Sequence, residues 1–536
     1  MSSLLKKRQI TQSVKGRIMD QQDRLIWIID FGSQYTQLIT RKSRELGFSS
    51  EIITLKESRK RIEEGLRPKA IVLSGGPMSV SEDENDYNFL IGLDELPTLG
   101  ICYGMQLMAK HWDGEVQKGL QGEYGHAKLH FEGDKIPGCP AEFNVWMSHF
   151  DHVVKAPKDF KTILMSKNNI IAGIQHESKP YLALQFHPEV EHSEHGKDIL
   201  RYFYEDIANL KSDWSAETML VEAKELASSV GDEYVLCAFS GGVDSLVAAT
   251  LCHEVLGDKV HCFFVDNGLL RPQDYHHIEL LKKETPLNIE VLDCKELFLS
   301  KLDGEGDPET KRKIIGTTFI EVFEKKVHEY EASHNIEFKY LLQGTLYPDV
   351  IESLSPHDED GKSSTIKSHH NVGGLPERMN LKLLEPLRFL FKDEVRVMGE
   401  QLGLKHEWVH RHPFPGPGIG IRILGKIDKK SIVKVQESDQ ILFEEMHNLD
   451  VYNSVWQAFT VLLPVNTVGV KGDARAYEQV ICLRLVNSTD GMTAEWSDVP
   501  RKFLSKVSSR ITNEVAGITR VVLDITSKPP GTIEWE

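Results

Sequence analysis

The seven cysteines of this 536-residue sequence are scattered along the chain and include no C-x-x-C pair. Their odd number and spacing argue against a disulfide framework or a structural zinc site, and favour reduced thiols in a cytoplasmic protein. No apolar run reaches membrane-spanning length, and the first residues lack the apolar segment of a signal peptide. Basic residues number 63 against 80 acidic residues, giving a net charge of −17. We therefore expect neither a membrane nor a nucleic acid as a partner.

A Walker A phosphate loop, G-x-x-x-x-G-K-S/T, is also missing. The nearest approach is Gly361-Lys-Ser363, but Pro356 stands where the first glycine belongs and no apolar strand precedes it. Any nucleoside triphosphate must therefore be bound by a loop other than a Walker A loop.

The chain is long enough for about two to four domains, and 40% of its residues are hydrophobic. Strand-like runs alternate with helical stretches from Leu25 and again from Tyr234, which predicts two doubly wound α/β domains with parallel sheets. A smaller α+β domain is expected at the C-terminal end. We predict a flexible N-terminal extension and three domains, over residues 1–23, 24–210, 211–412 and 413–536.

Cys102 lies between an apolar strand and a predicted helix that begins near Met105, in the turn Gly100-Ile-Cys-Tyr-Gly104. Small residues on both sides of a nucleophile allow a sharp turn that presents it above the sheet. A helix N-terminus and a nearby imidazole would both favour the thiolate. Taken alone, however, a free cysteine is as often a small apolar core residue.

His187 and Glu189 follow an apolar strand over 181–186, and Pro188 ends the strand between them. A histidine oriented by a carboxylate is the partner that a cysteine nucleophile requires. The combination therefore predicts a catalytic group of Cys102, His187 and Glu189.

Gly75 and Gly76 follow another predicted strand, over 70–73. Their amides and that of Tyr103 are candidates for stabilising an oxyanion.

The stretch Ser240-Gly-Gly-Val-Asp-Ser245 connects an apolar strand over 234–239 to a helical run over 246–252. A strand, a glycine turn and a helix start bring several backbone N–H groups together, which favours a bound phosphate. Gly241 and Gly242 permit close approach of the backbone to an anion. The alternative is an ordinary Gly-Ser turn.

Other residues of this domain are candidates for contact with ATP. Val265 and Asp266 end the second strand, where an acidic residue can meet a ribose or an adenine edge. Lys392 opens a helix and either offsets diphosphate charge or is a surface lysine. The polar stretch 355–374 is typical of a lid or an unstructured loop. The complete set of predicted ATP-binding residues is Ser240, Gly241, Gly242, Val243, Asp244, Ser245, Val265, Asp266, Gly344 and Lys392.

Asp244 is unusual in a phosphate loop, because a carboxylate beside phosphates requires a cation between them. Asp349 is either a second carboxylate ligand or an aspartate of a turn. The pattern predicts Mg²⁺ held by Asp244 and Asp349 as the cofactor that accompanies ATP.

Three motifs, S-G-G-P over 74–77, G-I-C-Y-G-M-Q over 100–106 and Q-F-H-P-E over 185–189, resemble those of class I glutamine amidotransferases. The resemblance covers about residues 25–205. It implies that the cysteine attacks a glutamine amide, that the histidine transfers protons and that the glutamate orients it. Phe150 stands where the family pattern has glycine. The residues that the resemblance assigns to glutamine binding are Gln106, Ser148, His149 and Phe150.

The sequence S-G-G-V-D-S likewise resembles the PP-loop of ATP pyrophosphatases. This resemblance implies that ATP is cut between its α and β phosphates and that AMP is transferred to an acceptor oxygen.

Four further motifs resemble glutamine-hydrolysing GMP synthetases: P-F-P-G-P-G from Pro413, S-H-H-N-V-G-G-L-P from Ser368, D-G-M-T-A-E-W from Asp490 and K-P-P-G-T-I-E-W-E from Lys528. With them the resemblance covers nearly the whole chain. It implies that xanthosine monophosphate (XMP), ATP and L-glutamine are substrates and that the chain forms a homodimer through its C-terminal domain. The residues that it assigns to XMP are Arg271, Lys471, Lys528, Ile533 and Glu534.

Composition and spacing alone lead only to glutamine-fed, ATP-dependent amidation. One alternative is an amidating ligase with another acceptor. A second is a regulatory nucleotide-binding protein whose glutaminase half is inactive.

Overall fold

The computed structural model describes residues 25–83, 85–353, 379–471, 474–488 and 493–536. The expected N-terminal extension and the predicted lid over 355–374 lie outside these residues. Contacts divide the chain into two compact units, one extending to Met219 and the other starting at Leu220. Helix α6 (Ala216–Ser228) contains the junction between them.

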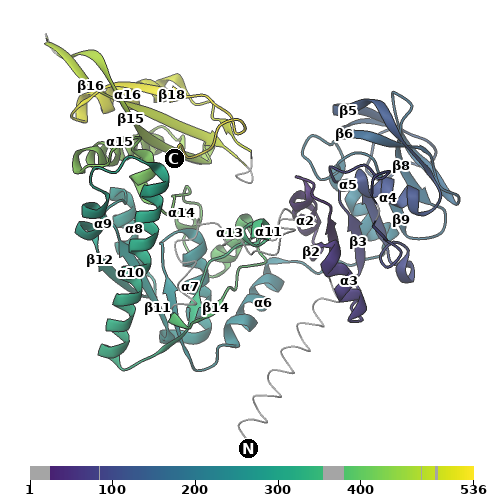
Figure 1. The fold of residues 1–536 in the computed structure, drawn as a ribbon, viewed down its shortest axis with the longest axis horizontal. Helices are drawn as coiled ribbons and strands as arrows, with labels where there is room; N and C mark the ends of the chain where they lie inside the picture. Colours follow the sequence, from purple (N-terminus) through teal and green to yellow (C-terminus); the bar gives the residue numbers. More distant parts are fainter. Residues whose placement is uncertain (1–24, 84, 354–378, 472–473, 489–492) are drawn as a thin grey trace, which may run out of the picture. The chain divides into compact units, whose positions relative to one another are not determined.

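The first unit is built on one sheet with the strand order β2-β1-β3-β4-β9-β8-β7-β5-β6 (Figure 1). Strands β2 to β9 in this order are parallel, and the remaining strands run antiparallel to their neighbours. The strand bounds are β1 (Ile26–Asp30), β2 (Ser50–Thr54), β3 (Ala70–Leu73), β4 (Thr98–Ile101), β5 (Glu115–Phe131), β6 (Glu142–Lys155), β7 (Phe160–Ser166), β8 (Ile171–His176) and β9 (Tyr181–Leu184).

The parallel strands are short and almost completely buried, as expected when helices cover both faces of a sheet. Strand β6 instead alternates buried and exposed residues, so only one of its faces packs on the core. The antiparallel strands extend the expected parallel sheet. The helices are α2 (Thr36–Glu45), α3 (Leu55–Glu63), α4 (Tyr103–His111) and α5 (Gly196–Arg201).

The second unit contains a parallel sheet with the strand order β12-β11-β10-β13-β14. Its strands are β10 (Tyr234–Ala238), β11 (Val260–Asp266), β12 (Asn288–Asp293), β13 (Phe338–Leu342) and β14 (Lys382–Leu384). Its helices include α7 (Val243–Leu256), α8 (Pro272–Glu284), α9 (Lys295–Leu302), α10 (Pro308–His334), α11 (Tyr347–Ser353), α13 (Lys392–Gln401) and α14 (His406–Val409).

A second sheet of this unit combines a long antiparallel hairpin with a parallel strand, and helices α15 and α16 pack against it (Figure 1). One apolar core runs through both parts of the unit, from Leu236 and Phe263 in the parallel sheet to Leu442 and Phe503 in the two helices. The elements are α15 (Lys429–Asn448), β15 (Gln457–Lys471), β16 (Ala474–Asn487), β17 (Glu495–Trp496), α16 (Arg501–Glu514) and β18 (Ile518–Asp524). The fold is thus the predicted pair of α/β sheets followed by a small α+β part.

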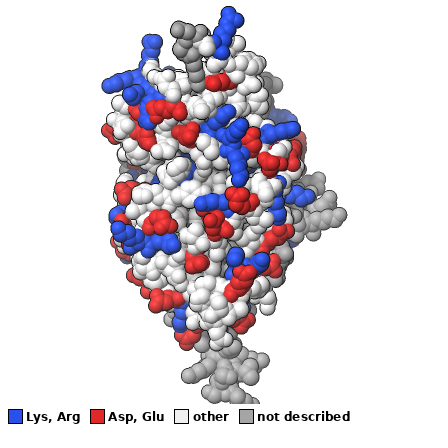
Figure 2. Space-filling model, turned by 90° about the vertical axis from the view of Figure 1, so that its left-hand side faces the viewer, with Lys and Arg blue, Asp and Glu red and all other residues white. Residues whose placement is uncertain are grey.

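On the face shown in Figure 2, basic and acidic side chains are interspersed, and neither sign forms a continuous patch. Among the described helices, none combines the length and apolar character needed to span a bilayer.

Candidate active sites

Cys102 sits in a strained turn between β4 and α4, with φ 52° and ψ −103°. Its N–H donates to the Leu184 carbonyl at 2.7 Å, which ties the turn to β9. A Cβ at Gly104 would lie 2.3 Å from the Leu73 carbonyl oxygen, so only glycine allows the helix to start this close to β3. The helix begins at Tyr103, two residues before the position expected from the sequence. Backbone strain of this kind is common where a nucleophile is presented.

His187 and Glu189 form a buried pair beside this thiol. His187 Nδ1 is 2.7 Å from Glu189 Oε1, and their side chains are 3% and 0% exposed. Burial alone would lower the pKa of His187, but the Glu189 carboxylate and the hydrogen-bonded Cys102 raise it to about 10. The structure therefore brings together the three residues predicted to be catalytic, in a thiol, imidazole and carboxylate series.

The predicted oxyanion donors lie next to the same imidazole. A Cβ at Gly75 would be 3.0 Å from His187 Cε1, which places this main chain beside the His187 ring. Gly76 lies against Phe31, and its added Cβ would be 3.4 Å from the Tyr103 ring. Tyr103 is the first residue of α4, so its N–H has no partner within the helix.

The residues assigned to glutamine have different surroundings. The Ser148 carbonyl accepts from Cys102 Sγ at 3.6 Å, while buried Gln106 donates from Nε2 to the Asp151 carbonyl at 2.7 Å. Buried His149 has its Nε2 3.5 Å from Glu123 Oε2. Phe150 is 51% exposed and packs edge-on against Tyr124, at 5.5 Å between ring centroids. All four lie on β6 or α4, on the elements around the cysteine.

Three side chains at this site were not predicted from the sequence. Gln185 Nε2 lies 3.8 Å from Cys102 Sγ, and Tyr35 packs edge-on against His187. Asp83 accepts hydrogen bonds from the Tyr103 and Tyr87 hydroxyls, so it anchors the first residue of α4. Gln185 belongs to the Q-F-H-P-E motif and could have been found there, whereas Asp83 lies in a loop without any local signal.

Replacing Glu189 by glutamine is expected to move the alkaline limit of the glutaminase activity that the class I motifs imply toward neutral pH. With its carboxylate present, the pKa of His187 is about 10. Without it, Cys102 alone opposes the lowering by burial, so the pKa of His187 falls. In the role that the family resemblance implies, the protonated imidazole supplies a proton to the departing ammonia, so activity falls as the ring deprotonates. Glutamate formation across the pH range checks this. Glu191→Gln, at an exposed glutamate nearby, is the control, and identical profiles for both variants would contradict it.

The phosphate-loop candidates form one compact turn in the second unit. Ser240 Oγ lies 3.0 Å from Ser245 Oγ and accepts from the Gly242 N–H at 3.2 Å. Gly241 has φ +72°, which a residue with a side chain rarely adopts. Helix α7 starts at Val243, directing its N-terminus into the turn. The loop thus has the concave, N–H-rich form that binds phosphate.

Asp244 is the carboxylate of this turn. Its Oδ2 is 3.3 Å from Lys392 Nζ, whereas its buried Oδ1 has no hydrogen-bond partner among the described residues. A Cβ at Gly344 would lie 2.8 Å from the Asp244 carbonyl carbon, so the chain that follows β13 passes close to the main chain of Asp244. Asp349 Oδ2 accepts from the Leu346 N–H at 2.9 Å. An unpartnered carboxylate oxygen beside a phosphate cradle fits a Mg²⁺ ligand.

Asp266 and Val265 are both buried at the end of β11. The Asp266 carboxylate accepts from the Gly268 N–H at 3.1 Å and from the Tyr275 hydroxyl at 2.9 Å. Lys295 Nζ lies 3.0 Å from it. In this state the carboxylate organises the loop that follows the strand.

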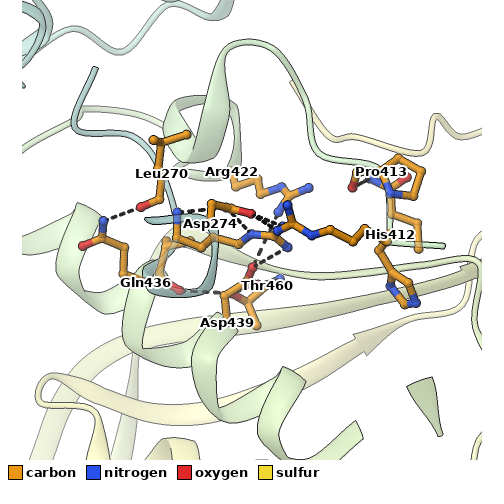
Figure 3. Close-up of polar contacts among 12 residues, drawn as sticks. Leu270, Asp274, His412, Pro413, Arg422, Gln436, Asp439 and Thr460 are labelled. Atoms are coloured by element: carbon orange, nitrogen blue, oxygen red, sulfur yellow. Dashed lines mark hydrogen bonds and ion pairs between the residues drawn. The ribbon is translucent and has the colours of Figure 1, made fainter. Parts of the chain in front are cut away.

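Two of the residues assigned to XMP, Arg271 and Glu534, belong to an ionic network with Asp274, Arg422 and Asp439. Figure 3 labels the last three of these residues. Arg271 binds Asp274 in bidentate fashion, at 2.8 and 2.9 Å. Arg422 binds Glu534 in the same way, at 3.1 and 2.8 Å. Asp439 joins the two pairs, because its Oδ2 lies 3.7 Å from Arg271 Nη1 and 3.6 Å from Arg422 Nη1.

The remaining residues assigned to XMP have separate surroundings. Ile533 packs against Phe459 and Val461. Lys528 lines a cavity of about 850 Å³ that Arg411 also lines. Lys471 ends β15, but its side chain lies outside the described part of the molecule.

Asp439→Asn is expected to lower the free energy of unfolding by about 3–5 kcal/mol, the usual cost of removing one partner from a buried ion pair. Asp439 is fully buried, and its Oδ1 accepts from the Thr460 N–H at 2.7 Å and the Thr460 hydroxyl at 2.9 Å. Asparagine can keep both bonds through its Oδ1, but its NH2 group replaces the charged Oδ2, so Arg271 and Arg422 lose the negative charge and the acceptor that faced them. Urea unfolding measures the change, with Glu437→Ala at an exposed position of α15 as the control. Equal stability of the two variants would contradict this role.

A group of three possible metal ligands also lies in the second unit, at Glu400, His406 and His410. His406 Nδ1 is 2.8 Å and His410 Nε2 is 3.2 Å from Glu400 Oε1. These side chains are partly or largely exposed and belong to none of the predicted sites.

A strained cysteine with a histidine–glutamate pair, and a phosphate loop in a second unit, define a glutamine-dependent ligase that uses ATP. Three family models match the chain. They are "Glutamine amidotransferase class-I" over 27–207, "Phosphoadenosine phosphosulfate reductase domain" over 234–345 and "GMP synthase C terminal domain" over 444–535.

Curated relatives match almost the full length. Proteins named "GMP synthase (glutamine-hydrolyzing)" from Chlorobaculum tepidum, Helicobacter acinonychis and Aquifex aeolicus are 49%, 50% and 47% identical. The matches cover 95%, 96% and 96% of this chain and 98%, 100% and 100% of the relatives. The chain belongs to the family of glutamine-hydrolysing GMP synthases.

Proposed function

We propose that this chain converts XMP to GMP, using ATP and L-glutamine and releasing AMP, diphosphate and L-glutamate. The Cys102 sulfur attacks the glutamine amide carbon, ammonia leaves, and water hydrolyses the resulting glutamyl thioester. In the second unit, the purine oxygen of XMP attacks the α-phosphorus of ATP and diphosphate leaves. Ammonia then displaces AMP from the purine carbon. Activation comes first because an amide-like oxygen is a poor leaving group.

The observation that carries this proposal is the arrangement of Cys102, His187 and Glu189 in a chain that also holds a phosphate loop. His187 accepts the thiol proton and returns a proton to the leaving ammonia, while Glu189 keeps the imidazole oriented. The amides of Gly75, Gly76 and Tyr103 stabilise the oxyanion. Glutamine itself is held by Gln106, Ser148, His149 and Phe150.

ATP binds with its phosphates in the turn Ser240–Ser245, and Lys392 offsets diphosphate charge. Val265, Asp266 and Gly344 line the nucleoside side at the strand ends. The unpartnered Oδ1 of Asp244 supports a Mg²⁺ site there, with Asp349 as the second carboxylate. Bound Mg²⁺ would neutralise phosphate charge.

The nucleotide acceptor is bound by residues that the second unit collects from distant parts of the chain. Arg271 and Glu534 already share one network through Asp439. Lys528 lines a cavity that is also lined by Arg411, a partner of Asp274. Ile533 and Lys471 complete the assigned set.

The chain forms a homodimer through its C-terminal part. Its compartment is the cytoplasm. The β15–β16 hairpin supports a second copy as the partner, because Val468, Val470 and Tyr477 are 58%, 74% and 70% exposed and large apolar side chains gathered on a surface favour association. Reduced, scattered cysteines support the compartment.

The experiment that tests the acceptor is incubation with ATP, ammonium and one nucleotide at a time, with diphosphate release as the readout. Release should require XMP. Turnover with another nucleotide in its place would identify a different amidating ligase, and no release with any nucleotide would favour a regulatory protein.

A further inference from the structure

Helix α8 touches the phosphate loop at Gly241. His277 is buried on this helix, and its Nε2 lies 3.2 Å from the Gly241 carbonyl oxygen. The next residue, Ile278, fills the space where a side chain of Gly241 would stand: an added Cβ would be 2.5 Å from Ile278 Cδ1. The loop is therefore held by both a polar and an apolar contact from one helix.

The polar contact fixes which way one peptide group faces. In a trans peptide the C=O and the following N–H point in opposite directions. With the Gly241 carbonyl turned toward His277, the Gly242 N–H points to the Ser240 hydroxyl, 3.2 Å away. Glycine peptides rotate at little steric cost. A reversed Gly241–Gly242 peptide would break the Gly242–Ser240 hydrogen bond and turn a carbonyl oxygen, instead of an N–H, toward the hydroxyl side of the loop, where its partial negative charge would disfavour a phosphate.

The imidazole has the right chemical form for this contact. Burial, aided by the nearby Arg411, lowers the pKa of His277 to about 4. A neutral ring that donates to the Gly241 carbonyl must carry its proton on Nε2. The first turn of the same helix is fixed by Asp274, which binds Arg271 at 2.8 Å and Arg411 at 2.7 Å. Arg271 and Arg411 outweigh burial and lower the pKa of Asp274 to about 2. The His277 ring thus belongs to a helix whose first turn is held by two ion pairs.

We propose that His277 is a positioning residue of the ATP site, which keeps the Gly241 carbonyl turned away from the Ser240 hydroxyl, so that the Gly242 N–H and not a carbonyl oxygen faces the side of the loop proposed to hold the phosphates. This inference rests on the proposed use of the loop for ATP and adds a residue outside the S-G-G-V-D-S motif to it. Helix α8, which begins next to Arg271, therefore also contacts the phosphate loop through His277.

The test compares His277→Leu, which cannot donate, with His277→Gln, whose amide N–H can donate to the same carbonyl. Loss of one hydrogen bond should weaken diphosphate binding and raise the KM for ATP about five- to tenfold in the leucine variant. The glutamine variant should stay within about twofold of the unchanged protein. The KM for XMP should be the same in all. Calorimetry with inorganic diphosphate and ammonium-dependent GMP formation supply the two readouts, on the full chain.

His276→Leu, at the exposed neighbouring histidine, is the matched control. His277→Asn, whose amide is shorter, replaces the leucine variant if that protein does not fold. Unchanged diphosphate affinity in the non-donating variant would overturn the proposal, as would equal weakening in the glutamine variant. Diphosphate binding does not depend on the acceptor, so failure of the unchanged protein to form GMP would count against the proposed function alone.

Discussion

Cys102→Ala is expected to abolish GMP formation from glutamine, by a factor on the order of 10⁴ or more, because the Cys102 sulfur forms the thioester in the proposed reaction. GMP formation from added ammonium should stay within about twofold of the unchanged protein, since the phosphate loop and acceptor residues are untouched. Glutamate release and GMP formation, measured with each nitrogen source, check both halves of the expectation.

Cys139→Ala is the matched control for this experiment. Cys139 is partly buried, and burial raises the pKa of its thiol to about 11, so it is a poor nucleophile at neutral pH. Loss of the ammonium-dependent reaction in Cys102→Ala would contradict two separable sites. Full glutamine use by that variant would show that the thiol is not the nucleophile.

Asp244→Asn is expected to have the opposite signature. GMP formation should fall on the order of 10²- to 10³-fold with either nitrogen source, the usual loss when one preorganised charged group at a reacting centre is removed. The side chain keeps its shape, but it loses the charge that Oδ1 presents with no hydrogen-bond partner among the described residues. Diphosphate release in the presence of XMP and ammonium, measured over a series of Mg²⁺ concentrations, is the readout.

The control for this variant is Asp258→Asn, at an exposed aspartate of the same unit. A partial recovery of Asp244→Asn at high Mg²⁺ would fit a weakened metal site. Retained activity at ordinary Mg²⁺ would refute a role for Asp244 in holding the ion.

Much of the catalytic chemistry could be predicted from short motifs, for a physical reason. A nucleophile elbow and a phosphate loop are made by consecutive residues, so the strand, turn and helix that form them are written in one stretch of sequence. Cys102 and Ser240–Ser245 therefore appear in the structure in the local setting that their neighbours predict. His187 and Glu189 could be paired with the cysteine because each follows a strand end in a parallel sheet.

Contacts between distant segments carried no such local signal. The antiparallel strands β5 to β8 extend the first sheet, although nothing in the alternating pattern separates them from other half-buried strands. Asp83 reaches Tyr103 across a loop, and Glu123 reaches His149 across a strand pair. In the sequence, Asp83 and Glu123 both look like ordinary surface residues.

The sequence by itself determined the two kinds of chemistry, because the groups proposed to perform them lie in continuous motifs. Only the tertiary structure decided how those groups are supported. The link from Arg271 through Asp439 to Arg422 and Glu534 joins residues far apart in the chain, and His277 meets the phosphate loop only after α8 has packed beside it. Buried charges and polar groups must find partners wherever folding brings them, and that pairing is a property of the packed chain, not of any stretch within it.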